Sequence, residues 1–480
     1  MRKKNGRILL LATAVALSVA ACGNKAAKGT AAESGTETES STAQGEAPSG
    51  APDGKAPDGK GGPGGAPGGA PGGSSADIDY KGAAEITTAT STSDQTYVSA
   101  TSDESALLIS TSDAVTVANP LLTKTGDSDG GDNCNFYGLN AALLVKGGSK
   151  ATITGGSITS NANGANGVFS YGGNGGKNGA SGDGTTVTIK DTKITTMGDG
   201  SGGIMTTGGG ITNASNLKVT TTGRSSAAIR TDRGGGTVVV DDGSYESSGL
   251  GSPAIYSTAD ITVSNAELKS YRAEGVCIEG LNSVKLENCN LTANNTERNG
   301  NATFLDSIMI YQSMSGDADS GTSSFTMNGG SLTSKSGHVF HVTNTDAVIT
   351  LNDVKIVNED SEKILLSVCA DGWSGGKNIA TLKASKQTLA GAVKVGNDST
   401  LNLELSDGSS FEGSVDGKIS NAKGETVSTE VGTVSVTLDS TSTWTLSADS
   451  YVSSFNGDAA NVTANGHTLY VNGVALTGTK

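Results

Sequence analysis

A short unit recurs through the body of the chain and restricts what the chain can fold into. Each unit opens with an aliphatic residue that follows a small residue (a histidine in the last unit), and short runs rich in Val, Ile and Thr come after it. The opening pairs are Ala142-Leu143, Gly167-Val168, Gly203-Ile204, Ala228-Ile229, Ala254-Ile255, Gly275-Val276, Ser307-Ile308 and His338-Val339. Successive pairs are 25, 36, 25, 26, 21, 32 and 31 residues apart. Repeats of about 20–50 residues indicate a solenoid, a propeller or an array.

Three short strands in 21–26 residues correspond to one coil of a parallel β-helix, in which each coil buries its inner face against its neighbours. A propeller blade needs about 40–45 residues, and a leucine-rich repeat would show a Leu-x-x-Leu-x-Leu pattern that this chain lacks. We therefore predict an all-β fold, a right-handed single-stranded parallel β-helix, over residues 78–480, with about ten to twelve coils. An N-terminal cap is expected over about 78–105, and C-terminal coils with a cap over about 390–480.

The first residues are typical of a bacterial export signal. Four basic residues precede a short apolar stretch at 8–19, which is too brief to span a bilayer. Val19-Ala20-Ala21-Cys22 matches a lipobox, which predicts a lipoprotein signal peptide over 1–21 and a lipidated Cys22 at the mature N-terminus. An ordinary signal peptide cut near Ala21 is the alternative. The lipobox predicts a lipid-anchored protein on the extracytoplasmic face of the cell membrane.

Residues 22–77 cannot form a core. They consist largely of Ala, Gly, Ser, Thr and Pro, and the sequence at 51–55 is repeated at 56–60. With so few large apolar side chains, the segment cannot offset the entropy lost on ordering. We expect it to be a disordered tether.

Charge and the remaining cysteines narrow the range of partners. The formal net charge is −15 at pH 7, and loss of the basic signal would make the mature chain more acidic. Nucleic acid is therefore not an expected partner, and an acidic polysaccharide would need bridging cations. Four cysteines beyond Cys22 show no CxxC pair, and we expect most of them to be unpaired thiols: Cys134, Cys277, Cys289 and Cys369. The three histidines are too few and too scattered to predict a zinc or Ser-His-Asp site.

Side chains alternate along a strand, so the residue after each inward aliphatic residue should face outward. Read in this register, one outer face gathers several aromatic rings: Phe169, Tyr171, Tyr256, Tyr311 and Phe340. Rings with polar neighbours suit a sugar, whose C–H face packs on the ring while its hydroxyls hydrogen-bond nearby. We predict a carbohydrate-binding platform on this face if the loops leave it open. The alternative is that the rings pack beneath the long loops or form a ladder across coils.

Charged residues on the same face suggest an alternative chemistry. A polysaccharide lyase needs a cation to neutralise a uronate and a base for the proton α to it. Arg230, Asp232 and Arg233 lie together, and Glu279 falls two coils away from Asp232, at roughly 10 Å. The same residues are also typical of surface ion pairs. Whether the protein is an enzyme is left open.

One carboxylate cluster could bind calcium. Asp127, Asp129 and Asp132 lie close together with two glycines, and Ca²⁺ takes six to eight oxygen ligands. The spacing departs from an EF-hand loop, and Asp/Gly-rich surface turns are common. We predict calcium as a possible cofactor on this basis, with Asp317 and Asp319 as a weaker candidate.

Several segments resemble a family of bacterial carbohydrate-binding β-helix lipoproteins, relatives of which are described as adhesins. The segments are Asn135-Phe-Tyr-Gly-Leu-Asn-Ala-Ala, Thr231-Asp-Arg-Gly-Gly-Gly, Ser252-Pro-Ala-Ile-Tyr-Ser-Thr, Ile308-Met-Ile-Tyr-Gln-Ser-Met-Ser-Gly-Asp-Ala, Phe325-Thr-Met-Asn-Gly-Gly-Ser-Leu and Ser442-Thr-Trp. The resemblance implies a pectate-lyase-like superhelix that binds acidic or plant-type polysaccharide, with bound calcium and without established catalysis. The family's calcium ligands do not map onto this chain residue by residue.

Three functions follow from these patterns. The first is a membrane-anchored, adhesin-like protein that binds polysaccharide without turnover. The second is a calcium-dependent polysaccharide lyase of the pectate type. The third is a structural cell-surface protein that interacts with other proteins. The sequence does not indicate the sugar or the oligomeric state.

Overall fold

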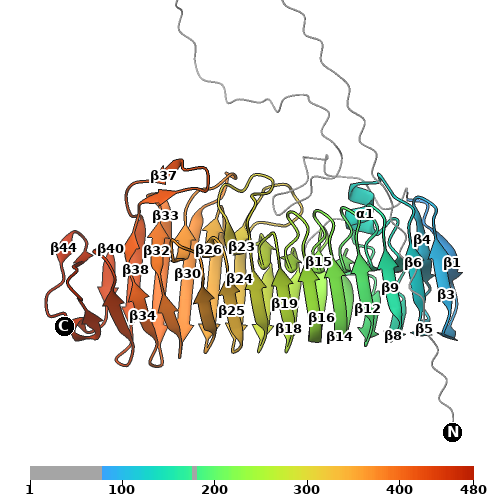
Figure 1. Ribbon diagram of the computed structural model, residues 1–480, viewed down its shortest axis with the longest axis horizontal. Helices are drawn as coiled ribbons and strands as arrows, with labels where there is room; N and C mark the ends of the chain where they lie inside the picture. Colours follow the sequence, from blue (N-terminus) through green and yellow to red (C-terminus); the bar gives the residue numbers. More distant parts are fainter. Residues whose placement is uncertain (1–77, 176–180) are drawn as a thin grey trace, which may run out of the picture. The chain divides into compact units, whose positions relative to one another are not determined.

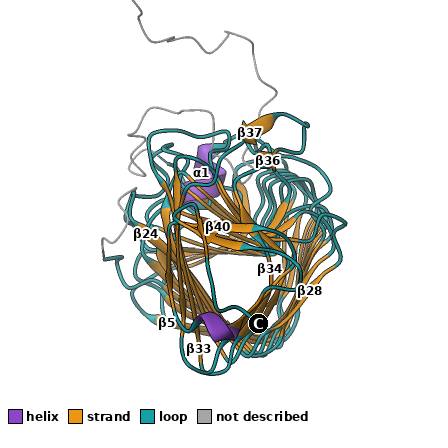
Figure 2. Cartoon of the chain, turned by 90° about the vertical axis from the view of Figure 1, so that its left-hand side faces the viewer, coloured by secondary structure: helices purple, strands orange, loops and turns teal. Residues whose placement is uncertain are grey.

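The computed structural model describes residues 78–175 and 181–480, all of which belong to a compact unit spanning Ala56–Lys480. The signal peptide, Cys22 and the tether over 22–77 lie outside the described residues. The described part is all-β and built mainly from parallel strands, which agrees with the predicted β-helix architecture. Figure 1 shows the coils stacked side by side along one axis, and Figure 2 looks along that axis at the walls that the strands form.

Sheet A forms one wall and takes one strand from each of thirteen coils, more than the ten to twelve expected. Its strands are β1 (Lys81–Ile86), β4 (Glu104–Ser110), β7 (Leu143–Lys146), β10 (Val168–Tyr171), β13 (Ile204–Thr207), β15 (Ile229–Thr231), β17 (Ile255–Ser257), β20 (Val276–Glu279), β23 (Asp306–Tyr311), β26 (His338–Thr343), β29 (Ile364–Val368), β32 (Ala392–Val395) and β35 (Val415–Asp416).

Sheet B contains the second strand of each coil and most of the third strands. Its strands are β2 (Thr90–Ser93), β3 (Thr96–Ser99), β5 (Ala114–Ala118), β6 (Leu121–Lys124), β8 (Lys150–Thr154), β9 (Ser157–Ser160), β11 (Thr186–Lys190), β12 (Lys193–Thr196), β14 (Gly210–Thr221), β16 (Gly236–Ser247), β18 (Asp260–Ser264), β19 (Glu267–Ser270), β21 (Ser283–Glu287), β22 (Asn290–Ala293), β24 (Thr322–Asn328), β25 (Ser331–Ser334), β27 (Asp346–Asn352), β28 (Lys355–Asn358), β30 (Asn378–Ser385), β33 (Ser399–Ser406), β38 (Thr433–Leu438) and β41 (Ser454–Asn456).

The remaining elements lie toward the C-terminus, apart from one short helix, α1 (Asp132–Tyr137). Sheet C contains β31 (Thr388–Ala390), β34 (Ser410–Gly413), β39 (Thr443–Leu446) and β42 (Val462–Thr463), and the other elements are the hairpin β36 (Ile419–Ser420) and β37 (Thr426–Ser428), the strands β40 (Ser450–Val452), β43 (Leu469–Val471) and β44 (Val474–Ala475), and the short helix η2 (Ala459–Asn461). The helix α1 and the β36–β37 hairpin project from the same side of the solenoid (Figures 1 and 2).

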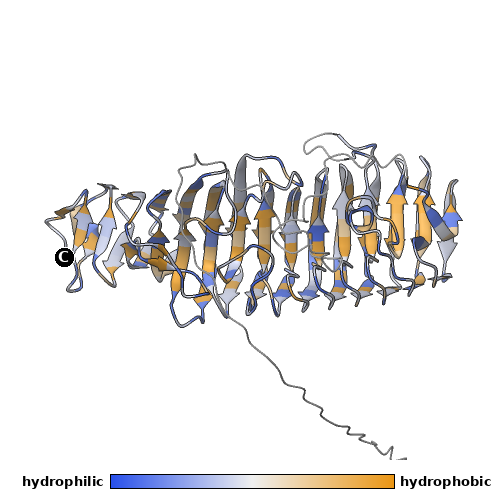
Figure 3. Cartoon of the chain, turned by 90° about the horizontal axis from the view of Figure 1, so that it is seen from above, coloured by the Kyte–Doolittle hydropathy of each residue, from blue (hydrophilic) through white to orange (hydrophobic). Residues whose placement is uncertain are grey.

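The inward column of sheet A follows the predicted register for seven of the eight units. Leu143 pairs with Val168, Val168 with Ile204, and the alignment continues to Ile308. All seven aliphatic residues lie in one continuous buried core. Apolar positions recur from strand to strand along the solenoid, as Figure 3 shows in orange. Each coil therefore buries its inner face against the coils before and after it.

The prediction for Phe340 is wrong. Ile308 pairs with Phe340 and not with Val339, so the alignment in β26 is displaced by one residue. A slip of one residue exchanges the two faces of a strand. Phe340 consequently lies in the main core, where its ring meets Phe325 edge-on at 5.9 Å between centroids, and His341 takes the outward position.

Corners between the second and third strands explain the many Asn and Asp residues in the turns. The first corner residue adopts a left-handed backbone, with φ of 53° at Asp191, 55° at Asn265 and 51° at Asn288. Asn and Asp tolerate this conformation better than other residues with a side chain. Lys386 is an exception, with φ of 51° at the corresponding corner.

A ladder of serines supports another corner. The hydroxyl of Ser226 accepts a hydrogen bond from the Ser201 amide at 2.9 Å and donates one to the Gly198 carbonyl at 3.1 Å. The hydroxyl of Ser252 repeats the pattern with the Ser226 amide, at 2.9 Å. Buried backbone groups must be paired, and these side chains supply the partners from one coil to the next.

The two ends of the solenoid differ. Residues 78–105, expected to be a cap, contain β1, β2 and β3, which pair in parallel with the strands of the following coil. At the C-terminal end, β43 and β44 form an antiparallel pair. Trp444 is buried in this half, and its ring nitrogen donates to the Gly413 carbonyl at 3.0 Å.

Candidate functional site

The outer face of sheet A is covered, which overturns the prediction of an open aromatic platform. Phe169, Tyr171, Tyr256 and Tyr311 lie outside the main core in two separate clusters, and the most exposed of them, Tyr256, is 7% exposed. A sugar cannot stack on rings that are covered to this extent. The alternative that the rings pack beneath the loops is confirmed.

Different segments cover the two aromatic clusters. Phe136 and Tyr137 of α1 pack with Phe169 and Tyr171, with the rings of Tyr137 and Tyr171 5.7 Å apart. In the second cluster, the Trp373 ring packs on Tyr311 with centroids 4.8 Å apart. Loops that join strands of sheet A to sheet B, or to the next coil, thus build an additional apolar layer on the outside of the wall.

The arginines named for a lyase form ion pairs beneath this layer, with Arg230 buried and Arg233 half-buried. An Arg230 nitrogen lies 2.7 Å from the Asp232 carboxylate, and an Arg233 nitrogen lies 2.6 Å from Asp317. The Arg233 guanidinium also lies over the Phe136 ring, 4.1 Å from its centroid. Burial raises the pKa of Asp232 to about 7, although the charge of Arg230 lowers it. These arginines are therefore engaged with carboxylates and hold the covering loops in place.

The Glu279 carboxyl group is also hydrogen-bonded within the protein. Its carboxyl group accepts hydrogen bonds from the hydroxyls of Tyr256 at 2.6 Å and Tyr311 at 3.0 Å, and from the hydroxyl of Ser313. Burial raises the pKa of Glu279, although the bonds from Ser313 and Tyr256 lower it. The structure thus brings the four lyase candidates into one buried network without presenting a base to solvent.

The aspartates considered for calcium do not converge. An Asp127 carboxylate oxygen accepts the Asn163 amide at 2.7 Å, whereas Asp132 lies in the first turn of α1. Over residues 78–175 and 181–480, no group of three or more His, Cys, Asp or Glu side chains is arranged to hold a metal ion. The donor set of Asp127, Asp129 and Asp132 therefore does not fit a calcium ion, and the Asp/Gly-rich turn is the better description.

All four cysteines of the described chain are unpaired and buried, as expected: Cys134, Cys277, Cys289 and Cys369. Burial raises the pKa of Cys134 to about 11, so its thiol stays protonated at neutral pH. These thiols pack as small apolar groups.

An open groove lies where the ladder of third strands is interrupted. β28 pairs with β25 on one side and β31 pairs with β34 on the other, and these two described strands do not pair with each other. The groove between them has a volume of about 800 Å³. Small-molecule sites typically measure about 300–1,000 Å³. This groove is the candidate functional site.

Two side chains bond to backbone groups beside the groove. The Gln387 amide accepts the Val354 amide at 2.9 Å and donates to the Val354 carbonyl at 2.7 Å, replacing the missing ladder at the corner. The Lys363 ammonium donates to the Asn358 carbonyl at 2.7 Å. The unpaired edges are thus partly satisfied by side chains, which maintains the opening without an additional strand.

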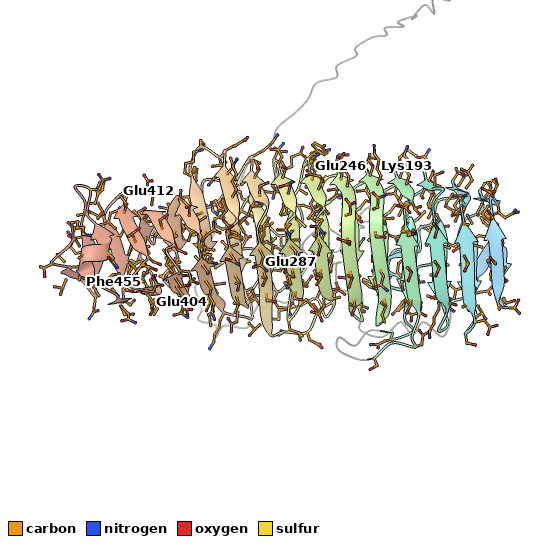
Figure 4. All side chains as sticks on the ribbon, turned by 90° about the horizontal axis from the view of Figure 1, so that it is seen from below. Lys193, Glu246, Glu287, Glu404, Glu412 and Phe455 are labelled. Atoms are coloured by element: carbon orange, nitrogen blue, oxygen red, sulfur yellow. The ribbon has the colours of Figure 1, made fainter. Side chains whose placement is uncertain are left out.

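Charged side chains of both signs line the groove. They are Lys355, Lys363 and Lys386, together with Asp353, Glu362 and Glu412. Figure 4 views the wall that carries Glu412, with Lys193 farther along the same wall. The formal charges of these six side chains cancel, so the groove offers many donors and acceptors without a strong net field.

This groove was not predicted from the sequence, although one signal for it was available. Most corners between second and third strands begin with Asn, Asp or Gly, whereas this one reads Lys386-Gln387. The departure marks the coil at which the ladder stops.

The expectation that the histidines are too scattered for a Ser-His-Asp arrangement is also wrong. His338 and His341 both lie within 2.7 Å of the Ser367 hydroxyl, and His341 faces Asp371. Ser367 follows His341 by one coil, and the two residues pair in adjacent strands of sheet A. The one-residue error at Phe340 hid this relationship.

Comparisons of the chain with models of protein families, with curated proteins and with solved structures found no match. Membership of the carbohydrate-binding β-helix family therefore stays a prediction from the segments quoted above. Across residues 78–175 and 181–480, the helices are all too short or too polar to cross a membrane.

Proposed function

We propose that the protein is a lipid-anchored glycan-binding protein whose right-handed β-helix binds an oligosaccharide in the groove between β28 and β31, without turnover. The observation that supports this proposal is the interruption of the third-strand ladder, which leaves a polar groove of about 800 Å³. The aromatic face considered first is covered and has no part in this proposal.

The groove suits hydroxyl-rich ligands. Sugar hydroxyls both donate and accept hydrogen bonds, and the groove combines ammonium donors with carboxylate acceptors. Hydrogen bonds to charged groups are stronger than those between neutral groups. Ile356 and Ala390 add apolar surface for C–H groups. Because the lining charges cancel, the groove favours a neutral sugar over a strongly acidic polymer.

The absence of aromatic rings among the groove's lining residues sets the expected affinity. Ring stacking contributes much of the affinity in many sugar sites, and here hydrogen bonds must supply it. We therefore expect weak binding of single oligosaccharides. A lipid anchor that gathers many copies on one surface would increase the overall avidity.

A glycan array probed with the full-length protein, with and without EDTA, tests the proposal. Lys355→Ala and Glu412→Ala should each weaken retention about tenfold, because the loss of one hydrogen bond to a charged group costs about 1.5–3 kcal/mol. Lys193→Ala is the matched control, since Lys193 occupies the position of Lys355 in a coil that is paired on both sides. Loss of binding in EDTA would show that a cation takes part.

Two outcomes would contradict the proposal. Retention that is unchanged in the Lys355 and Glu412 variants would exclude the groove. Glycan-independent binding to another protein would favour the structural alternative. The lipid anchor is tested separately by metabolic labelling with a fatty acid, which Cys22→Ser should abolish.

A further inference from the structure

A column of reactive side chains runs along the outer face of sheet A in its C-terminal half. Its members come from five consecutive coils in register: Met309, His341, Ser367, Lys394 and Asp416. Neighbouring strands lie about 4.8 Å apart. Ser367 therefore stands between an imidazole on one side and a lysine on the other.

A hydrogen bond connects Ser367 to His341, and the other ring nitrogen of His341 faces an aspartate. The Ser367 hydroxyl lies 2.7 Å from Nδ1 of His341 and 2.7 Å from Nδ1 of His338. Nε2 of His341 faces Oδ2 of Asp371 at 3.5 Å. The other oxygen of Asp371 accepts the Thr303 amide at 2.8 Å and the Thr303 hydroxyl at 2.5 Å, which fixes the carboxylate.

The neighbouring groups indicate which ring nitrogens of His341 and His338 carry a proton. Burial raises the pKa of Asp371, but the neighbouring His341 imidazole and the hydrogen bonds from Thr303 outweigh it and lower the pKa overall, so Asp371 is an acceptor. Nε2 of His341 then carries a proton toward Asp371, and its Nδ1 accepts the proton of the Ser367 hydroxyl. His338 must donate from Nδ1 to the Ser367 oxygen. Burial lowers the pKa of His338 to about 3, which keeps this imidazole neutral.

We propose that Ser367 is the nucleophile of an acyl-transfer site that cleaves carboxylic esters, with His341 as its general base and Asp371 as the residue that orients His341. Acyl transfer requires a nucleophile that is hydrogen-bonded to a base, and a third group that orients this base. This proposal is independent of the glycan-binding groove.

The reaction proceeds in two balanced steps. The Ser367 oxygen bonds to the ester carbonyl carbon while its proton passes to Nδ1 of His341, and the alcohol leaves with that proton. Water then attacks the acyl-serine, gives its proton to His341, and releases the carboxylic acid as Ser367 recovers its proton. Water is the only co-reactant.

Lys394 extends the site toward solvent. Its side chain is 19% exposed, and it pairs with the Asp416 carboxylate, 22% exposed, at 2.8 Å. Lys394 is the neighbour of Ser367 in the ladder, and it lies at the partly exposed end of the column.

The β36–β37 hairpin covers the other side. Phe304 packs on the His341 ring with centroids 4.6 Å apart, and Ile419 of the hairpin is buried against Phe304 and Cys369. The Ala422 amide also donates to the Thr303 carbonyl at 3.0 Å. Ser367 is fully buried in this arrangement. Access therefore requires the hairpin, which carries a mostly exposed tip over residues 420–426, to move as a lid.

Labelling of the full-length protein with a fluorophosphonate probe, followed by mass spectrometry of the modified peptide, tests the proposal. Ser367 should be modified, and Ser367→Ala should abolish the label. Asp371→Asn keeps the shape of the side chain but should slow labelling at least about tenfold, because loss of the orienting carboxylate strongly reduces nucleophilicity. Ser361→Ala, which removes an exposed serine of the same coil, is the control and should label normally.

A variant with a loosened β36–β37 hairpin distinguishes a reactive Ser367 that is merely covered from a Ser367 that is unreactive. Ile419→Ser removes the apolar contact that holds the hairpin and should accelerate the labelling of Ser367 several-fold. Circular dichroism of each variant verifies that the β-helix is folded. If Ser367 stays unmodified in both the native protein and a folded Ile419→Ser variant, or if Asp371→Asn labels at the native rate, the cluster has a structural role only and the proposal is overturned.

Discussion

Glu274 offers the sharpest test of how burial determines the stability of this protein. It is buried just before β20 of sheet A, and one oxygen of its carboxyl group has no hydrogen-bond partner among the described residues. Asp306 lies near Glu274, and one of its carboxyl oxygens also has no hydrogen-bond partner among the described residues. Burial raises the pKa of Glu274 from 4.5 to about 7, and burial together with the charge of Glu274 raises that of Asp306.

The sign of the effect follows from proton linkage. Between pH 4.5 and about 7, folded Glu274 holds a proton that the unfolded chain has released. Glu274 therefore lowers the free energy of unfolding as the pH rises through this window, and it adds no further change above the window. A shift from 4.5 to about 7 corresponds to a loss of about 3 kcal/mol, at 1.36 kcal/mol per pKa unit.

Glu274→Gln removes this cost while keeping the size of the side chain. We expect the variant to unfold at a higher urea concentration than the native protein at pH 8, with a gain of up to about 3 kcal/mol. At pH 4 the two proteins should be nearly equal, because native Glu274 is then protonated in both states. Urea unfolding of the full-length proteins, followed by circular dichroism at pH 4, 6 and 8, measures the difference.

An exposed carboxylate provides the control. Glu430→Gln changes the net charge by the same amount at a solvent-exposed position, and should leave the pH dependence as it is in the native protein. A stability difference between Glu274→Gln and the native protein that does not change with pH would refute the reasoning, because it would show that Glu274 has the same pKa in the folded and the unfolded chain.

Three further changes test the corners. Lys386→Asn should raise the free energy of unfolding by about 1 kcal/mol, since Asn tolerates φ of 51° better than Lys; an unchanged urea midpoint would contradict this. Gly223→Ala should cost about 3 kcal/mol or more, because its Cβ would lie 1.8 Å from the Gly198 carbonyl oxygen; a native melting temperature would argue against so close an approach. Ser226→Ala should cost about 1–3 kcal/mol in urea, because the Ser201 amide loses its partner; no change would mean that water replaces the hydroxyl.

The interior of the coils could be predicted from the sequence in detail. Alternation along a strand is local, so the aliphatic residues from Leu143 to Ile308 could be assigned to the core without knowledge of any contact. The Asn and Asp corners follow equally from backbone preferences. The prediction failed at Phe340, where the interval between units is 32 residues and an alignment by residue type was displaced by one position.

What covers the outer face could be decided only by tertiary structure. Arg230 contacts Asn135, 95 residues earlier in the chain, and Arg233 pairs with Asp317, 84 residues later. Such contacts depend on how far each loop reaches across several coils, and no periodicity encodes that distance. The groove also could not be predicted from the repeat. It exists because β28 and β31, which both follow the repeat, do not pair with each other. The sequence by itself determined which side chains face inward, because that choice is local, whereas which outward side chains meet solvent depended on loops folding back over distant coils.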